Sequence, residues 1–127
     1  MKLYHGSPKK LEILKPTKAK GLTEFENQTA VYLVDTFLHA SLYAIGKTLK
    51  GKTQFLVKKD KLVIVGNFDL DIGYVYEVEV NNPICGERNQ YASLVELIPI
   101  KITLVNPLDY EKYIFRVKDK SELFKEI

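Results

Sequence analysis

Leu3-Tyr4-His5-Gly6-Ser7 is the segment of this chain that best predicts both its fold and its candidate site. The apolar start favours a short buried strand, which stops where a histidine, a glycine and a serine follow one another. Glycine permits a close backbone approach or a positive φ, and the two neighbouring side chains add polar groups. The segment predicts a pocket for a polar ligand at a strand end. An ordinary strand-end histidine followed by a turn glycine has the same pattern.

The composition is that of a folded protein of ordinary size. The chain has 127 residues, of which 46% are hydrophobic and 28% are charged, so we expect a single domain over residues 1–127 with a real core. The net charge of +3 gives only weak support for a nucleic-acid partner. No apolar run approaches the roughly 20 residues needed to cross a bilayer, so we expect no membrane partner.

Cysteine and histidine are too scarce for several kinds of site. Cys85 is the only cysteine, so it cannot form an internal disulfide, and with no signal peptide this predicts a reducing, cytoplasmic setting. The two histidines are far apart and do not form a zinc cluster of recognised spacing, so we expect no metal. The chain also lacks a P-loop, a Gly-x-Gly-x-x-Gly motif and a Gly-x-Ser-x-Gly motif.

One helix is well supported, and most of the remaining chain has strand character. Asp35-Thr36 resembles an N-cap, Gly51 a C-terminal stop, and an apolar stripe of helical period lies between them. Strands are expected at residues 2–5, 30–34, 53–57, 62–65, 73–80, 91–94, 98–105 and 110–117. These features predict an α+β fold in which two small antiparallel sheets pack together, with the 35–51 helix over one side and a cleft between the sheets.

Two further segments offer ligand-binding side chains. Tyr32 ends a strand, and Ser41 and Tyr43 lie on the helix that follows. Two tyrosines at one strand–helix junction can stack on a planar ligand, although two core tyrosines have the same pattern. Gln90 stands where a polar loop meets a strand, and its amide can hold a pair of ribose hydroxyls. A solvated loop end is the alternative there. His39 is expected to be a surface or boundary histidine.

The three segments together resemble the ADP-ribosyltransferases of the His-Tyr-Glu type, which include the poly(ADP-ribose) polymerases and small bacterial rifampin ADP-ribosyltransferases. In that family one strand ends in Tyr-His-Gly-Ser, a second ends in a tyrosine before a helix, and a third opens with an acidic residue. The matching segments cover residues 3–93 and are Tyr4-His5-Gly6-Ser7, Tyr32-Leu33-Val34-Asp35 with Ala40-Ser41-Leu42-Tyr43, and Asn89-Gln90-Tyr91-Ala92-Ser93.

The resemblance implies a site for NAD. His5 would hydrogen-bond the adenosine-side ribose, the Gly6 backbone would pair with the nicotinamide amide, and Tyr32 and Tyr43 would enclose the nicotinamide ring. Two serines are candidates for a further contact to that amide. Ser41 is one position away from the family's serine, which is Ala40 here, and Ser7 is the other candidate. Gln90 would lie beside the nicotinamide ribose.

Gln90 is the main departure from the family pattern, because acidic members have a carboxylate there. That carboxylate stabilises the positive charge that develops when the glycosidic bond breaks. Glutamine keeps a hydrogen bond but has no charge and cannot act as a base, and losing one such group slows turnover by roughly 10²–10³. Chain elongation is therefore not expected, whereas transfer of a single unit is. Arg88 occupies the position at which some arginine-modifying toxins have an acidic residue, which argues against that branch.

Three functions remain open from the sequence. The first is mono-ADP-ribosyl transfer from NAD to a protein, nucleic-acid or small-molecule acceptor, with release of nicotinamide. The second is a module of the same fold that has lost the chemistry and binds NAD, ADP-ribose or a phosphorylated nucleic-acid end. The third is a nucleic-acid-binding domain, supported only by the modest positive charge.

Overall fold

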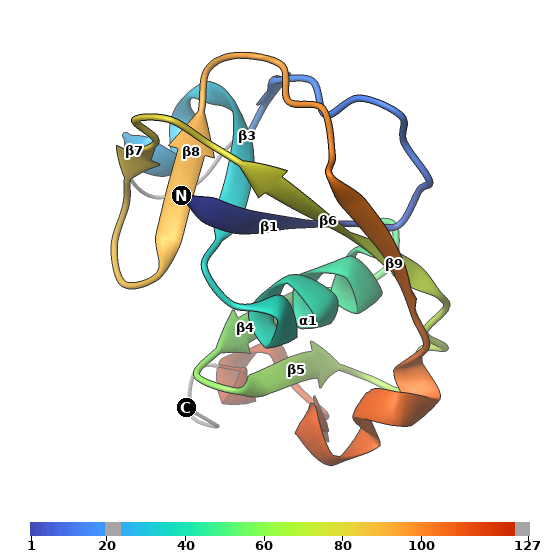
Figure 1. The fold of residues 1–127 in the computed structure, drawn as a ribbon. Coiled ribbons are helices and arrows are strands. Elements are labelled where there is room, and N and C mark those ends of the chain that lie inside the picture. The colour runs from blue at the N-terminus through green and yellow to red at the C-terminus, as the bar shows by residue number, and fades with distance from the viewer. Residues whose placement is uncertain (20–23, 124–127) are drawn as a thin grey trace.

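The computed structural model describes residues 1–19 and 24–123, and it confirms an α+β architecture with two mostly antiparallel sheets. Figure 1 shows both sheets and the α-helix that lies between them. No helix among the described residues has the length and apolar character needed to cross a membrane.

The larger sheet contains seven antiparallel strands among the described residues. It includes the three strands at whose ends His5, Tyr32 and Gln90 were expected. Its order is β7-β8-β3-β1-β6-β9, and the short β2 pairs with β3. The strands are β1 (Lys2–Ser7), β2 (Thr17–Lys18), β3 (Thr29–Val34), β6 (Gly73–Glu79), β7 (Ile84–Cys85), β8 (Gln90–Ser93) and β9 (Lys101–Val105). β1 therefore lies in the middle of the sheet, between β3 and β6.

The smaller sheet contains β4 (Phe55–Lys58), β5 (Lys61–Val65) and β10 (Ile114–Val117). β4 and β5, which correspond to the strands expected at 53–57 and 62–65, form an antiparallel hairpin. β10 pairs with β5 in parallel, which corrects the expectation of purely antiparallel sheets. The strand expected at 110–117 is also shorter, because Asn106 caps a 3₁₀ helix over Pro107–Tyr113. Two further 3₁₀ turns lie at Phe25–Asn27 and Lys120–Glu122. For residues 119–127 the sequence leaves open a short tail helix or a frayed terminus, and this segment lies partly outside the described residues.

Helix α1 (Phe37–Lys47) begins where the sequence predicts and ends earlier. The Thr36 hydroxyl caps it by accepting a hydrogen bond from the backbone N–H of His39 at 3.2 Å. The helix stops at Lys47 rather than near Gly51. Turns follow, with positive φ at Lys50 and Gly51.

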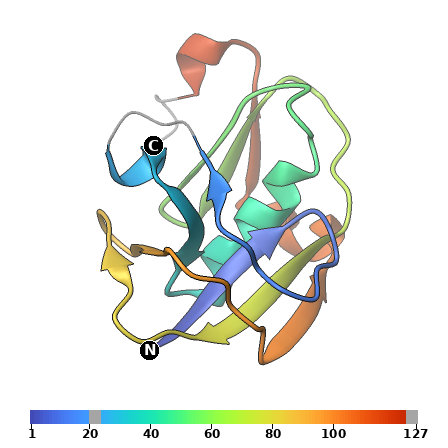
Figure 2. The same ribbon diagram turned by 90° about the horizontal axis from the view of Figure 1, so that it is seen from above.

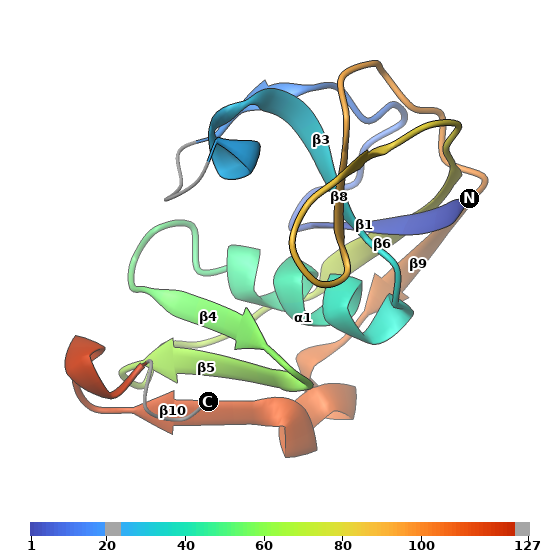
Figure 3. The same cartoon turned by 90° about the vertical axis from the view of Figure 1, so that its left-hand side faces the viewer.

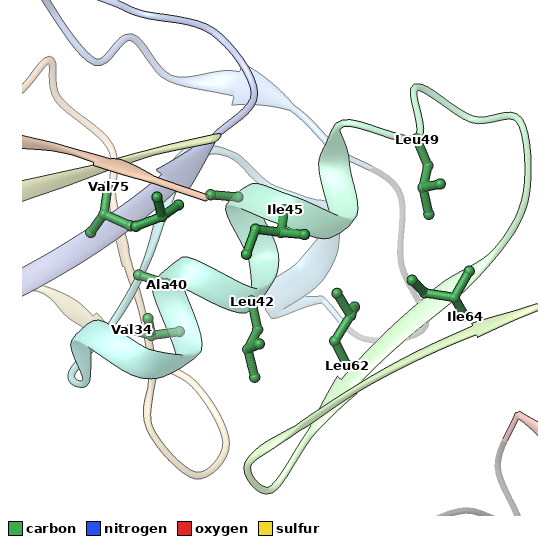
Figure 4. Close-up of a cluster of buried hydrophobic side chains, with 10 residues drawn as sticks. Val34, Ala40, Leu42, Ile45, Leu49, Leu62, Ile64 and Val75 are labelled. Atoms are coloured by element: carbon green, nitrogen blue, oxygen red, sulfur yellow. The ribbon is translucent and has the colours of Figure 1, made fainter. Parts of the chain in front are cut away.

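Helix α1 lies between the two sheets, so the expectation that it covers one side of a sheet pair is wrong (Figures 2 and 3). Its own apolar stripe is wide enough to be buried on both sides. Figure 4 shows Leu42 facing Leu62 of β5, whereas Ala40 lies toward Val34 and Val75 of the larger sheet. The helix therefore separates the sheets and fills the space in which the predicted cleft between them was placed.

Gly6 is required by the close approach of α1 to β1. A Cβ atom at Gly6 would lie 2.2 Å from the Ala40 carbonyl oxygen and 2.7 Å from the Ala44 nitrogen. Positive φ among the described glycines occurs at Gly51 and Gly66, not at Gly6. Contact with the helix therefore accounts for this glycine, where the sequence suggested a ligand approach or a positive φ.

Candidate ligand-binding site

A cavity opens where β1 and β3 separate. The two strands pair in register only at Tyr4 and Val34, and Figure 1 shows β3 running steeply away from β1. The space between them, closed by α1 and the start of β8, is a cavity of about 640 Å³, which we call the first cavity. This volume is within the range of small-molecule sites, roughly 300–1,000 Å³.

The first cavity brings together most of the residues singled out from the sequence. Those that line it are His5, Gly6, Ser7, Tyr32, Tyr43 and Gln90. They come from β1, β3, α1 and β8, so segments far apart in the chain converge here. Ser7 is the least available of these side chains, because it is buried and its hydroxyl accepts a hydrogen bond from the Lys9 backbone N–H at 3.1 Å.

The structure places Ser41 away from this cavity, which corrects its assignment as a ligand contact. Its hydroxyl donates to the Phe37 carbonyl at 2.8 Å and lies 3.1 Å from the Tyr110 hydroxyl, which donates to it. One residue along a helix is a rotation of about 100°, so when Ala40 lines the cavity its neighbour cannot. The family's serine position is thus occupied by a side chain without a polar group.

His5 presents a neutral imidazole to the cavity. Its Nδ1 lies 2.7 Å from the Tyr32 carbonyl oxygen, and since a carbonyl only accepts, Nδ1 carries the proton. Burial, with a smaller contribution from the positive charge of Lys47, lowers the pKa of His5 from 6.5 to about 4, although the hydrogen bond to Tyr32 opposes this shift. At pH 7 the ring is therefore neutral and Nε2 is a hydrogen-bond acceptor suited to a hydroxyl group.

Lys47 is a cavity residue that the sequence analysis missed. Its ammonium donates a hydrogen bond to the Gly6 carbonyl oxygen at 2.8 Å, and burial lowers its pKa from 10.5 to about 8. The available signal was its spacing of seven residues from Ala40, which places both on one helix face. A cation therefore lies at the backbone of Gly6, which the resemblance assigns to the nicotinamide amide.

Tyr32 is held rigidly, so it offers a ring surface rather than a free hydroxyl. Its hydroxyl lies 2.9 Å from the carbonyl oxygens of both Phe25 and Gln28. The rings of Phe25 and Tyr32 meet edge to face with centroids 5.7 Å apart. Burial raises the pKa of Tyr32 above 10, partly offset by the hydrogen bond to Gln28. These contacts fix the ring in the orientation in which it lines the cavity.

Tyr43 and Gln90 form a hydrogen-bonded pair in the wall of the first cavity. Burial raises the pKa of the Tyr43 hydroxyl, and its hydrogen bond to the Gln90 side chain opposes this rise, as does the positive charge of Arg88. Gln90 pairs with Val34 across β8 and β3, beside the point where β1 and β3 separate. The Gln90 amide is therefore positioned by the sheet and by a phenol.

A second cavity of about 480 Å³ shares Tyr43 and Gln90 with the first. His39, expected at the surface or its boundary, lies in its wall and joins three segments. Nδ1 of His39 lies 2.6 Å from the Thr36 hydroxyl and 2.7 Å from the Asn89 side-chain nitrogen. Nε2 lies 2.6 Å from the Lys59 carbonyl oxygen. The histidine thus connects the start of α1 with the loop before β8 and the β4–β5 turn.

Comparison with protein-family models, with curated proteins and with solved structures gives no match for this chain. Across residues 1–19 and 24–123, no group of three or more His, Cys, Asp or Glu side chains is arranged to hold a metal ion. The function proposed below therefore rests on the geometry of the two cavities.

Proposed function

We infer that the first cavity binds NAD and that the protein transfers ADP-ribose from it to an acceptor, releasing nicotinamide. The observation that supports this is the convergence of His5, Tyr32, Tyr43 and Gln90 on one cavity of suitable size. A dinucleotide needs hydroxyl acceptors, flat surfaces for its rings and a polar group at the reacting ribose. His5 can supply the acceptor, the two tyrosines the flat surfaces, and Gln90 the polar group.

In this proposal each side chain has one role. Nε2 of His5 accepts a hydrogen bond from the adenosine-side ribose. The rings of Tyr32 and Tyr43 enclose the nicotinamide, where stacking adds roughly 0.5–1.5 kcal/mol per pair beyond burial. Gln90 binds a hydroxyl of the nicotinamide ribose and so orients the carbon that is attacked.

The bond broken is the one between that ribose carbon and the nicotinamide nitrogen. Its electron pair stays with nicotinamide, which leaves as a neutral molecule, and positive charge develops on the ribose. Lys47 favours this step, because a cation beside Gly6 destabilises the charged ring of NAD more than the neutral product. The acceptor then forms the new bond at the same carbon.

A second candidate, a binding module without chemistry, is favoured by two observations. Gln90 has no negative charge to stabilise the reacting ribose, and the Lys47 ammonium in the cavity wall attracts an anionic ligand. ADP-ribose or a phosphorylated nucleic-acid end satisfies both features, because neither carries the positive charge of the nicotinamide ring.

The test is nicotinamide release from NAD by the purified protein, with cell extract as the source of acceptor. We expect release that is lost in His5→Ala and Tyr32→Ala. Tyr113→Ala is the matched control, because that tyrosine is also half-buried but lies in the 3₁₀ helix before β10. Circular dichroism confirms that each variant is folded. If the protein binds NAD yet releases no nicotinamide with any extract, transfer is wrong and the binding module remains.

A further inference from the structure

The second cavity has a larger excess of positive charge than the first, whose charged lining residues are Lys15, Lys47 and Glu26. Lys58, Lys59 and Arg88 line the second cavity and supply three positive charges, against the single carboxylate of Asp35. Asp35, Lys59 and Arg88 are all exposed, so water screens their charges alike, and an excess of positive charge remains in the lining. Cavities lined by one sign of charge concentrate ligands of the opposite sign. The second cavity is therefore suited to an anionic group.

The cations lie on segments that are held in place. Asn89, next to Arg88, donates its side-chain N–H to Nδ1 of His39 at 2.7 Å. The Lys59 carbonyl lies 2.6 Å from Nε2 of the same ring, and the Asp60 carboxylate lies 3.2 Å from it. Both loops are thus fixed to the start of α1. Because both loops are already fixed, binding an anion costs less conformational entropy than it would if the loops had to be ordered first.

The second cavity also adjoins the reacting ribose of the proposed function. Tyr43 and Gln90 line both cavities, and Gln90 is the side chain assigned to that ribose. A group bound among the three cations therefore lies next to Gln90 and close to the ribose carbon at which the glycosidic bond breaks. An acceptor has to be held close to this carbon in order to attack it.

We propose that the second cavity binds the phosphate monoester of an acceptor and that an oxygen of this phosphate attacks the nicotinamide ribose. The proposal rests on the transfer activity proposed above. The new bond joins the phosphate oxygen to the ribose carbon, the bond from that carbon to nicotinamide breaks, and its electron pair leaves with neutral nicotinamide. A phosphate monoester has a second pKa near 6, so its oxygen is already deprotonated at pH 7 and no proton has to be removed.

This assignment explains why glutamine is sufficient at position 90. A hydroxyl or amine acceptor needs a base, which Gln90 cannot provide. A phosphate needs none, and its own negative charge lies where a carboxylate would stabilise the developing cation. A guanidinium acceptor, by contrast, is repelled by Lys58, Lys59 and Arg88.

The experiment compares acceptors that differ only in phosphate. The purified protein is incubated with NAD and an oligonucleotide carrying a terminal phosphate, or the same oligonucleotide without it. A small sugar phosphate and inorganic phosphate form two further arms. We expect the terminal phosphate to raise nicotinamide release at least about tenfold, with an ADP-ribosylated oligonucleotide detected by mass spectrometry. Release with the sugar phosphate alone would show that a free phosphate ester is sufficient, and release confined to the oligonucleotide would assign the phosphate to a nucleic-acid end.

Charge variants connect the response to the second cavity. Arg88→Gln and Lys59→Gln are expected to raise the acceptor concentration needed for half-maximal release by about tenfold each, which corresponds to about 1.4 kcal/mol. Lys101→Gln is the control, because this lysine is exposed on β9 and away from both cavities.

The two proposals fail in different ways. Cell extract treated with phosphatase is compared with untreated extract. If both extracts support equal nicotinamide release, transfer stands and the phosphate acceptor is overturned. If neither phosphorylated probe nor any extract supports release, transfer itself is wrong and the phosphate acceptor is overturned with it.

Discussion

The first cavity is built from strand ends and one helix face, whereas the second is built from two loops that His39 holds to the start of α1. The first offers rings, a neutral imidazole and one enclosed ammonium. The second offers three cations, of which Lys59 and Arg88 are exposed. This difference suggests a division of work in which rigid elements orient a dinucleotide and loop charges select its partner. Gln90 belongs to both, so changes there should distinguish the two roles most strongly.

Gln90→Glu is expected to give the largest effect, because it adds a carboxylate to the wall shared by the cavities. A negative charge at the reacting ribose should raise acceptor-independent release of nicotinamide by about 10²–10³, since a carboxylate can also activate water. The measurement is nicotinamide release from NAD in buffer. Gln54→Glu, at an exposed position just before β4, is the control. Unchanged release would favour the binding module.

Gly6→Ala should damage both cavities at once, because α1 forms a wall of each. The added Cβ would lie 2.2 Å from the Ala40 carbonyl oxygen, so the helix must move away from β1. We expect a loss of about 3 kcal/mol or more in the free energy of unfolding, the upper part of the range for overpacking. Urea unfolding measures it. Gly51→Ala should cost only about 1 kcal/mol, since space is open there and only its φ of +77° is unfavourable. Equal losses would mean that helix contact does not explain Gly6.

A third prediction concerns the histidine of the first cavity. The pKa of His5 is about 4 in the folded protein, below the ordinary 6.5. Between pH 6.5 and 4 the unfolded chain therefore binds a proton that the folded protein does not. The contribution of the neutral ring to the free energy of unfolding is fully present above pH 6.5. It decreases by about 3 kcal/mol as the pH falls to 4. Unfolding free energies at several pH values, compared with those of His5→Gln, should show this slope only in the parent protein. Parallel curves for the two proteins would contradict it.

The parts of the fold that were predictable depend on local signals. A few adjacent residues predict the cap at Thr36 and the strand that begins at Lys2, and the structure has both, although β1 continues to Ser7, past the expected end at residue 5. The register of β1 beside β3 and the approach of β8 bring the predicted site residues to one cavity. The sequence suggested this convergence only through the family resemblance, because strand order is not a local property.

The parts that were missed depend on contacts between distant segments. The sequence pattern of α1 does not say which sheet it meets, and the helix meets both. For the same reason Ser41 was assigned to the site and Lys47 was not, whereas Lys47 lines the first cavity and Ser41 does not. Rotation about the helix axis turns Ser41 toward Tyr110, whereas Lys47 reaches Gly6. A lysine in the last turn of a helix interacts favourably with the helix dipole in any case, and only the position of β1 reveals its contact with the cavity.

The smallest expected effect concerns Lys47, the enclosed cation that distinguishes the first cavity from the second. The oxidised nicotinamide ring of NAD is positively charged and the ring of NADH is not. If the ring binds beside Gly6, the ammonium at 2.8 Å from that carbonyl should weaken NAD relative to NADH while Lys47 is charged. Since its pKa is about 8, the penalty should be present at pH 6.5 and largely absent at pH 9. We expect the ratio of the two dissociation constants to change about tenfold across this range, as measured by calorimetric titration. Lys47→Met should remove the change, and a ratio that varies with pH in this variant as it does in the parent would place the nicotinamide ring away from Gly6.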